Sequence, residues 1–188
     1  MSQFEYIMVM VSLILALGVA QALRGLSEVV TSEKRYTPHT VWIAYFAVLI
    51  IQNWWAYWDY NNVDEWRFTT YLFVLLNPIT LFASVYLLVP NTRTSGIDWR
   101  EHLLSVTPWV CGLGVFSVAS SIASNVIYFD PLLLHPYRIF QVLIGVLYLA
   151  GIFAKNEKFQ SGLPYLLLLT LIISQLVIRS KIGALMAN

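Results

Sequence analysis

Side-chain amides stand inside two of the most apolar stretches of this chain. Asn53 lies in the run from 41 to 58, and Asn77 lies near the centre of the run from 68 to 90, directly before Pro78. An amide in hydrocarbon is costly unless it finds a hydrogen-bonding partner. Pro78 adds a second such group, because a proline inside a helix frees a backbone carbonyl about four residues earlier. The pattern favours either hydrogen bonds that hold two helices together or a polar cavity at the kink.

Hydroxyl side chains form a second polar pattern in the run from 103 to 129. Ser117, Ser120, Ser121 and Ser124 are spaced i, i+3, i+4 and i+7, which puts them on one face of a helix. Small residues of this kind either let helices pack closely or line the path of a solute. The candidate residues of a pathway or binding site are therefore Asn53, Asn77, Pro78, Ser117, Ser121 and Gln141.

Aromatic side chains cluster at the end of the run from 41 to 58. Trp54, Trp55 and Trp58 precede Asp59, and tryptophans gather at membrane surfaces because their rings are amphipathic. The four residues thus predict an aromatic rim at headgroup depth. The alternative is a cage for a cation, because Trp55, Trp58 and Asp59 share one helical face.

The composition places these residues in a membrane protein. The chain is 59% hydrophobic and only 11% charged, whereas a soluble domain has about 25% charged residues. A helix needs about 20 apolar residues to cross a bilayer, and six runs of roughly this kind contain no Asp, Glu, Lys, Arg or His. We therefore predict an all-α protein, one domain of residues 1–188 with six transmembrane helices in a compact bundle. The predicted spans cover residues 6–23, 41–58, 68–90, 103–129, 139–154 and 159–178.

The ends of the first run carry the information on how the chain is inserted. Glu5 stands where a signal peptide would have a basic residue, so we expect this run to be retained as a helix. Arg24, one turn after Gln21, is expected to anchor the helix end at the membrane surface, and residues 25–40 are expected to form mainly a loop.

The short links 59–67 and 155–158 predict two antiparallel helix pairs. Lys and Arg residues favour the cytoplasmic side, and the links after the first, third and fifth runs hold seven of them against four on the other side. The seven are Arg24, Lys34, Arg35, Arg93, Arg100, Lys155 and Lys158, and the four are Arg67, Arg138, Arg179 and Lys181. This count predicts an N-terminus outside the cell. The short loops and the expected absence of a cleaved signal favour a bacterial inner membrane. Two groups of three spans also leave open an inverted repeat.

The sequence lacks the residues that several classes of function require. The predicted spans hold no Asp, Glu, His or Lys for a proton relay, and the single cysteine, Cys111, rules out a multi-cysteine metal site. We expect no enzymatic activity, no cofactor, no metal site and no nucleic-acid partner.

The favoured function is a channel or carrier subunit for a small uncharged or cationic solute, surrounded by membrane lipids and acting as a homo-oligomer or with a partner membrane subunit. The alternative is a structural or signalling subunit that binds lipid or a partner protein without transport. A protein that handles lipids or quinones is a third hypothesis.

Overall fold

The computed structural model describes residues 2–63, 66–90, 97–128 and 137–178. In this part of the chain the fold is all-α, as predicted. Six α-helices and one short 3-10 helix follow one another: α1 Gln3–Thr31, α2 Thr37–Ala56, η1 Tyr57–Asn62, α3 Phe68–Leu88, α4 Trp99–Tyr128, α5 Arg138–Phe153 and α6 Glu157–Ile178. The assignment of residues 1–188 to one domain stays a prediction.

Four of these helices, α1, α3, α4 and α6, are long and apolar enough to cross a membrane. This suggests an integral membrane protein with several passes. The prediction of six spans is wrong by this measure. α5 has only 16 residues, and the apolar stretch of the continuous helix α2 is shortened by Pro38 and His39 near its start and by Gln52 and Asn53 near its end.

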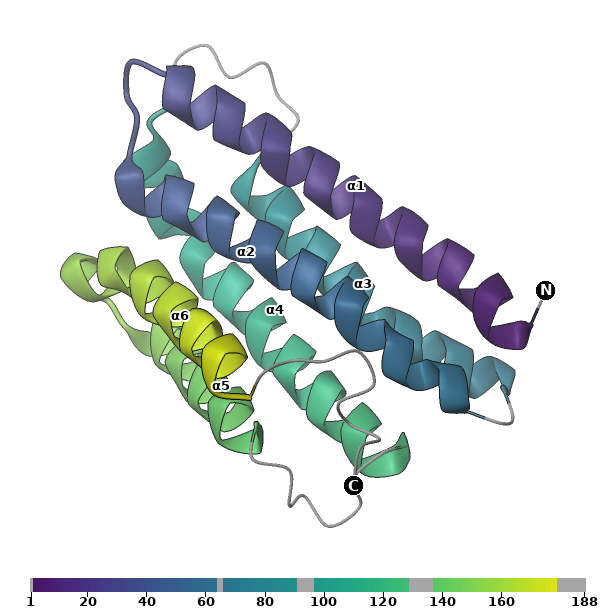
Figure 1. Ribbon diagram of the computed structural model, residues 1–188. Helices are drawn as coiled ribbons and strands as arrows, with labels where there is room; N and C mark the ends of the chain where they lie inside the picture. Colours follow the sequence, from purple (N-terminus) through teal and green to yellow (C-terminus); the bar gives the residue numbers. More distant parts are fainter. Residues whose placement is uncertain (1, 64–65, 91–96, 129–136, 179–188) are drawn as a thin grey trace.

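Five helices form a closed ring. α2, α3, α4, α5 and α6 each pack against the next, and α6 packs back against α2, while α1 lies outside the ring against α2 and α3 (Figure 1). We name the two ends of this bundle by what they hold. The cap end lies around His39, Leu88, Trp99 and Glu157, and the cavity end lies around Tyr57 and Asn125.

α1 is longer than its apolar run. A capping box starts it, in which the Ser2 hydroxyl accepts from the Glu5 amide and the Glu5 carboxylate accepts from the Ser2 amide. Beyond Arg24 the chain remains helical to Thr31, so the expected loop over residues 25–31 is wrong. An ion pair of 2.7 Å between Arg24 and Glu28, one turn apart, supports this last stretch.

The C-terminus of α3 is held by side chains from two other helices. The last carbonyls of a helix lack partners within it. His39 Nε2 of α2 donates to the Leu88 carbonyl at 3.0 Å, and His102 Nε2 of α4 donates to the Leu87 carbonyl at 3.1 Å. These two histidines therefore act as caps for α3.

α1 caps the next two carbonyls after α3. Gln21 Nε2 donates to the Val89 carbonyl at 2.5 Å, and Arg24 Nη2 donates to the carbonyls of Val89 and Pro90 at 3.2 and 3.3 Å. Gly25 allows this close approach, because a Cβ atom there would collide with the Val89 side chain. Arg24 thus binds backbone carbonyls directly after α3 in addition to any role as a surface anchor.

The half of the bundle near the cap end is filled with large side chains. Trp42, Trp99, Leu103, Leu163 and Leu167 are fully buried there. At the surface of this end, Arg100 of α4 makes a bidentate ion pair with Glu157 of α6 at 2.6 and 2.7 Å. The cap end is therefore closed by packing inside and by polar contacts at its rim.

Candidate binding cavity

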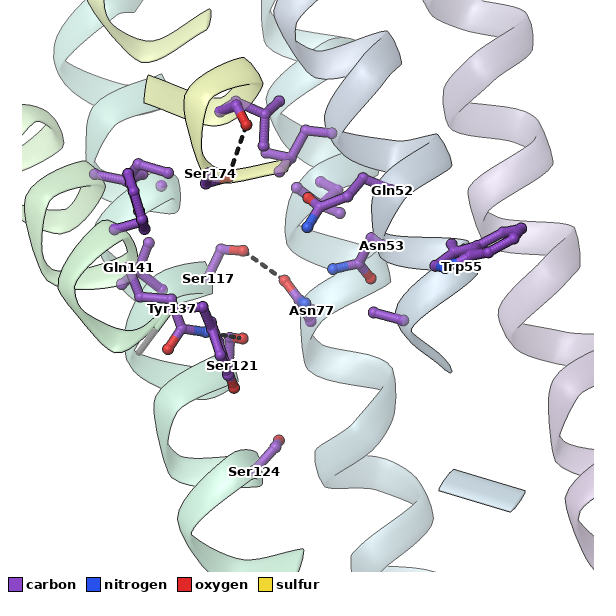
Figure 2. Close-up of a pocket in the computed structure, with 18 of the residues that line it drawn as sticks. Gln52, Asn53, Trp55, Asn77, Ser117, Ser121, Ser124, Tyr137, Gln141 and Ser174 are labelled. Carbon is purple, nitrogen blue, oxygen red and sulfur yellow. Dashed lines mark hydrogen bonds between the residues drawn. The ribbon is translucent and has the colours of Figure 1, made fainter. Parts of the chain in front are cut away.

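A cavity of about 220 Å³ lies inside the five-helix ring, in the half toward the cavity end. All five ring helices line it together with η1, and α1 does not contribute to it (Figure 2). Most of its polar residues carry no charge. They are Gln52 and Asn53 of α2, Asn77 and Ser84 of α3, Ser117, Ser121, Ser124 and Asn125 of α4, Gln141 of α5, and Ser174 and Gln175 of α6.

Two tyrosines form the floor of the cavity at mid-depth. Tyr148 of α5 donates its hydroxyl hydrogen to the Tyr45 hydroxyl of α2 at 2.9 Å, and both side chains are buried. Trp42 lies beyond them and stacks on the Tyr148 ring at a centroid distance of 6.4 Å. Among the lining residues of α2, α4 and α5, none lies nearer the cap end than Tyr45, Gly114 and Tyr148. The described residues thus form a cavity that ends inside the bundle.

Gly114 makes this floor possible. A Cβ atom at this position would lie 2.5–2.6 Å from the Tyr148 ring, which is far inside van der Waals contact. The absence of a side chain on α4 therefore lets the Tyr148 ring lie across the middle of the ring of helices.

Asn77 and Ser117 connect α3 with α4 across one wall. Ser117 Oγ donates to Asn77 Oδ1 at 2.5 Å (Figure 2). Pro78, the next residue of α3, is buried and does not line the cavity. The carbonyl that Pro78 frees belongs to Val74, and it accepts a hydrogen bond of 2.8 Å from the Tyr57 hydroxyl. The proline break is therefore closed by a side chain of η1.

Gln141 is oriented by a charged neighbour. Arg138 Nη1, one turn earlier on α5, donates to Gln141 Oε1 at 2.5 Å, and Gln141 Nε2 donates to Ser121 Oγ of α4 at 3.1 Å. An arginine can only donate, so it fixes which end of the amide faces α4. The candidate residues Ser121 and Gln141 thus belong to one hydrogen-bonded chain.

Asn53 and Gln52 of α2 face the cavity from the opposite side. Asn53 Oδ1 is buried and accepts no hydrogen bond within the described residues. Most buried polar side-chain atoms in proteins have a partner. His39 Nδ1, Trp42 Nε1 and Trp99 Nε1 also lack one among the described residues, but these residues do not line the cavity, whereas Asn53 does. It marks the wall of α2 as able to receive a donor.

The predicted aromatic rim divides into two parts. Trp54 is 53% exposed and donates to Ser12 Oγ of α1 at 3.2 Å, and Trp58 is 51% exposed and meets the Phe4 ring edge to face. Both therefore pack toward α1 on the outside. Only Trp55 and Asp59 line the cavity, so the structure does not bring Trp55, Trp58 and Asp59 together as a cage.

Charge is sparse around the cavity. Asp59 is the only ionisable carboxyl among the lining residues, and Arg138 stands behind Gln141; these two side chains are 5% and 8% exposed. Tyr60 also lines the cavity, and burial raises its pKa to about 12, so its hydroxyl is neutral at physiological pH. The cavity therefore offers mainly neutral donors and acceptors between apolar and aromatic walls.

Five of the six predicted pathway candidates line this cavity. The sequence analysis did not predict the two tyrosines of its floor or the hydrogen-bonded chain from Arg138 through Gln141 to Ser121. Tyr45, Tyr148 and Arg138 carry no pattern of their own, although a tyrosine in the apolar run of α5 facing a glycine of α4 is a usable signal. Comparison with protein-family models, curated proteins and solved structures found no match for the chain.

Proposed function

We propose that this protein is a small membrane carrier that binds a solute in the cavity of its five-helix ring. The observation that supports the proposal most directly is the cavity itself, with uncharged polar groups from five helices held inside the bundle. Polar groups at membrane depth are costly when they only face lipid, and they are typical of sites for solutes. A structure without a binding role would fill this space, as the cap half is filled.

A carrier fits this geometry better than an open channel. The cavity ends at Tyr45 and Tyr148, and behind them the bundle is packed with Trp42, Trp99 and Leu103. A solute bound above the two tyrosines reaches the other side only if the cap half rearranges. Alternating exposure of one site is the usual mode of such carriers.

We further propose that α2 and α5 lie in the bilayer with the four longer helices, because they complete the ring. The outer face of α5 supports this, since its exposed residues are apolar: Ile139, Val142, Leu143, Val146, Leu149 and Phe153. Six helices would keep both termini on one side. The predicted outside location of the N-terminus stays a prediction, and Arg93, Arg179 and Lys181 lie outside the described residues. A reporter fused to the C-terminus tests it.

One chain encloses the proposed cavity, so binding requires no second copy. A homo-oligomer or a partner membrane subunit stays a prediction, as does the lack of enzymatic activity. Native mass spectrometry after mild extraction would report the number of subunits and any retained lipid or second polypeptide.

Uptake into proteoliposomes tests the carrier proposal. We expect purified protein to speed the uptake of at least one of urea, glycerol and tetramethylammonium, measured by stopped-flow light scattering against liposomes without protein. Asn77→Leu should abolish the increase, because it removes the lining amide and its bond with Ser117. Asn61→Leu, the same change at an exposed amide of η1, is the matched control.

Unchanged uptake in Asn77→Leu would mean that Asn77 does not line the path. No uptake of any of the three solutes, with a correctly folded protein, would favour the alternative of a structural or signalling subunit. The observation that favours such a subunit is the dense packing of the cap half, together with the hydrogen bonds that neighbouring helices make to the C-terminus of α3.

A further inference from the structure

We infer that the cavity recognises a neutral molecule that carries a carbonyl-type acceptor together with an N–H donor, as a carboxamide does. The inference rests on the proposed function, because it assumes that the cavity binds a solute. The chemistry of that solute follows from which groups of the cavity wall are free to donate a hydrogen bond and which are free to accept one.

Ser121 supplies one donor. Arg138 occupies the oxygen of Gln141, so the amide nitrogen of Gln141 must face α4, where it donates to Ser121 Oγ. The Ser121 hydroxyl hydrogen then has no acceptor among the described residues. Ser120 differs, because its hydroxyl donates to the Phe116 carbonyl of its own helix. The Ser121 hydrogen is therefore available to an acceptor atom in the cavity.

Asn77 supplies a second donor from the neighbouring helix. Its oxygen Oδ1 accepts from Ser117, one turn before Ser121 on α4. No hydrogen bond of its amide nitrogen is found among the described residues, and Asn77 lines the cavity. The Asn77 amide and the Ser121 hydroxyl thus present donors from α3 and α4 into the same space (Figure 2). Two converging neutral donors suit a carbonyl oxygen.

Asn53 supplies the acceptor. Its oxygen Oδ1 is buried and unpartnered within the described residues. Figure 2 shows the amide nitrogen of Asn53 on the side of α4, and a half-turn of the amide group brings the oxygen to face the cavity. A ligand N–H would give this oxygen the hydrogen bond that the protein does not provide. A buried acceptor left without a donor is costly, so a ligand that supplies the donor gains affinity.

The body of the ligand should be apolar and without net charge. The floor and walls around the amides consist of Tyr45, Phe46, Leu81, Ile144 and Tyr148. A cavity of about 150 Å³ is known to accept benzene, so 220 Å³ has room for a benzene ring with a small polar group. Around Asn53, Asn77 and Ser121 a charged group would exchange its hydration for neutral dipoles, which disfavours ions there. The one lining carboxyl, Asp59, belongs to η1, and a cationic probe reports whether it sets the preference instead of the amides.

Four probes of nearly equal shape test the inference: benzamide, benzoate, benzylammonium and toluene. Binding to the protein in lipid nanodiscs is measured by saturation-transfer NMR, and nanodiscs without protein give the background from partition into lipid. We expect benzamide to have the lowest Kd. Ser121→Ala and Asn53→Leu should each raise that Kd about tenfold, as loss of one hydrogen bond implies. Ser120→Ala is the matched control and should leave it unchanged.

Asn53→Asp provides a second test that does not depend on the stability of Asn53→Leu. It keeps the shape of the side chain and adds a negative charge, so the preference should move from benzamide toward benzylammonium. Equal or tighter binding of benzoate, benzylammonium or toluene to the wild-type protein overturns the inference and leaves the cavity as a binding site. If no probe binds, the inference fails, and the uptake of urea, glycerol and tetramethylammonium decides separately whether the carrier proposal fails with it.

Discussion

The half of the bundle near the cap end and the half near the cavity end differ in the space around their polar groups. Near the cap end, the carbonyls of Leu87, Leu88 and Val89 accept hydrogen bonds from side chains of neighbouring helices. Large side chains fill the space around them. Near the cavity end, the amides of Asn53 and Asn77 keep unused hydrogen-bonding capacity beside open volume.

α3 passes through both halves and shows what the difference means. Its C-terminus is fixed by three other helices, while its middle carries Pro78 and depends on Tyr57 for one hydrogen bond. Saturated polar groups in a packed interior serve stability. His39 Nδ1, Trp42 Nε1 and Trp99 Nε1 in the packed half also lack a partner among the described residues, but none of these residues lines the cavity. Asn53 borders the cavity, where a ligand can supply the missing hydrogen bond, which is why we attribute it to binding.

Shortening an aliphatic side chain to alanine should lower the free energy of unfolding more in the cap half than in the cavity half, and this is the largest expected difference. Leu103→Ala in the cap half should lower the free energy of unfolding by about 2–4 kcal/mol, because it leaves a new hole in a packed region. Ile144 is half-buried and already borders the cavity, so Ile144→Ala should cost less than Leu103→Ala, at or below the lower end of this range, about 2 kcal/mol. Reversible unfolding in mixed detergent micelles measures both. Equal costs would mean that the two halves are equally packed.

The boundary between the halves can be disturbed at Gly114. Gly114→Ala puts a methyl group against the Tyr148 ring, so the ring must move and its bond with Tyr45 must weaken. We expect a loss of about 1–3 kcal/mol, as is usual for overpacking. Gly112→Ala, two residues earlier on the same helix, meets nothing within 4 Å and is the control. It should be neutral or slightly stabilising, because alanine favours a helix over glycine.

The fold was predictable where hydrophobicity alone decides it. Each predicted run contains most of one helix, because apolar length is visible in a sequence. The ends were less predictable. α1 continues through residues 25–31 because Arg24 pairs with Glu28 and binds carbonyls 65 and 66 residues away in the chain. No local pattern reveals partners at such separations.

The candidate site was predictable in its residue types and not in its arrangement. Amides and serines inside apolar runs pointed to Asn53, Asn77, Ser117, Ser121 and Gln141, which all line the cavity. Pro78 does not, since the carbonyl it frees is bound by Tyr57 instead of opening to the cavity. Which tryptophans face inward depends on how α1 packs against α2, and that information is tertiary.

The proline break in α3 offers a smaller test of the cavity half. Tyr57→Phe should lower the free energy of unfolding by about 1–3 kcal/mol, because the Val74 carbonyl loses its donor. Pro78→Ala restores a backbone N–H four residues after Val74. In that background Tyr57→Phe should cost much less, and a double-mutant cycle measures the coupling. Additive costs would show that Tyr57 does not compensate for the proline.

Substitutions in the serine stripe of α4 should change the free energy of unfolding least, and the change should differ between neighbouring positions. Ser117→Ala removes a bond between α4 and α3 and should cost about 0.5–1.5 kcal/mol. Ser120→Ala removes only a bond to its own helix, so the change in the free energy of unfolding should stay within about 0.5 kcal/mol. A stripe that served only close packing would respond alike at both positions. A difference between these neighbours would instead show that the stripe works through Ser117, where α4 faces the cavity.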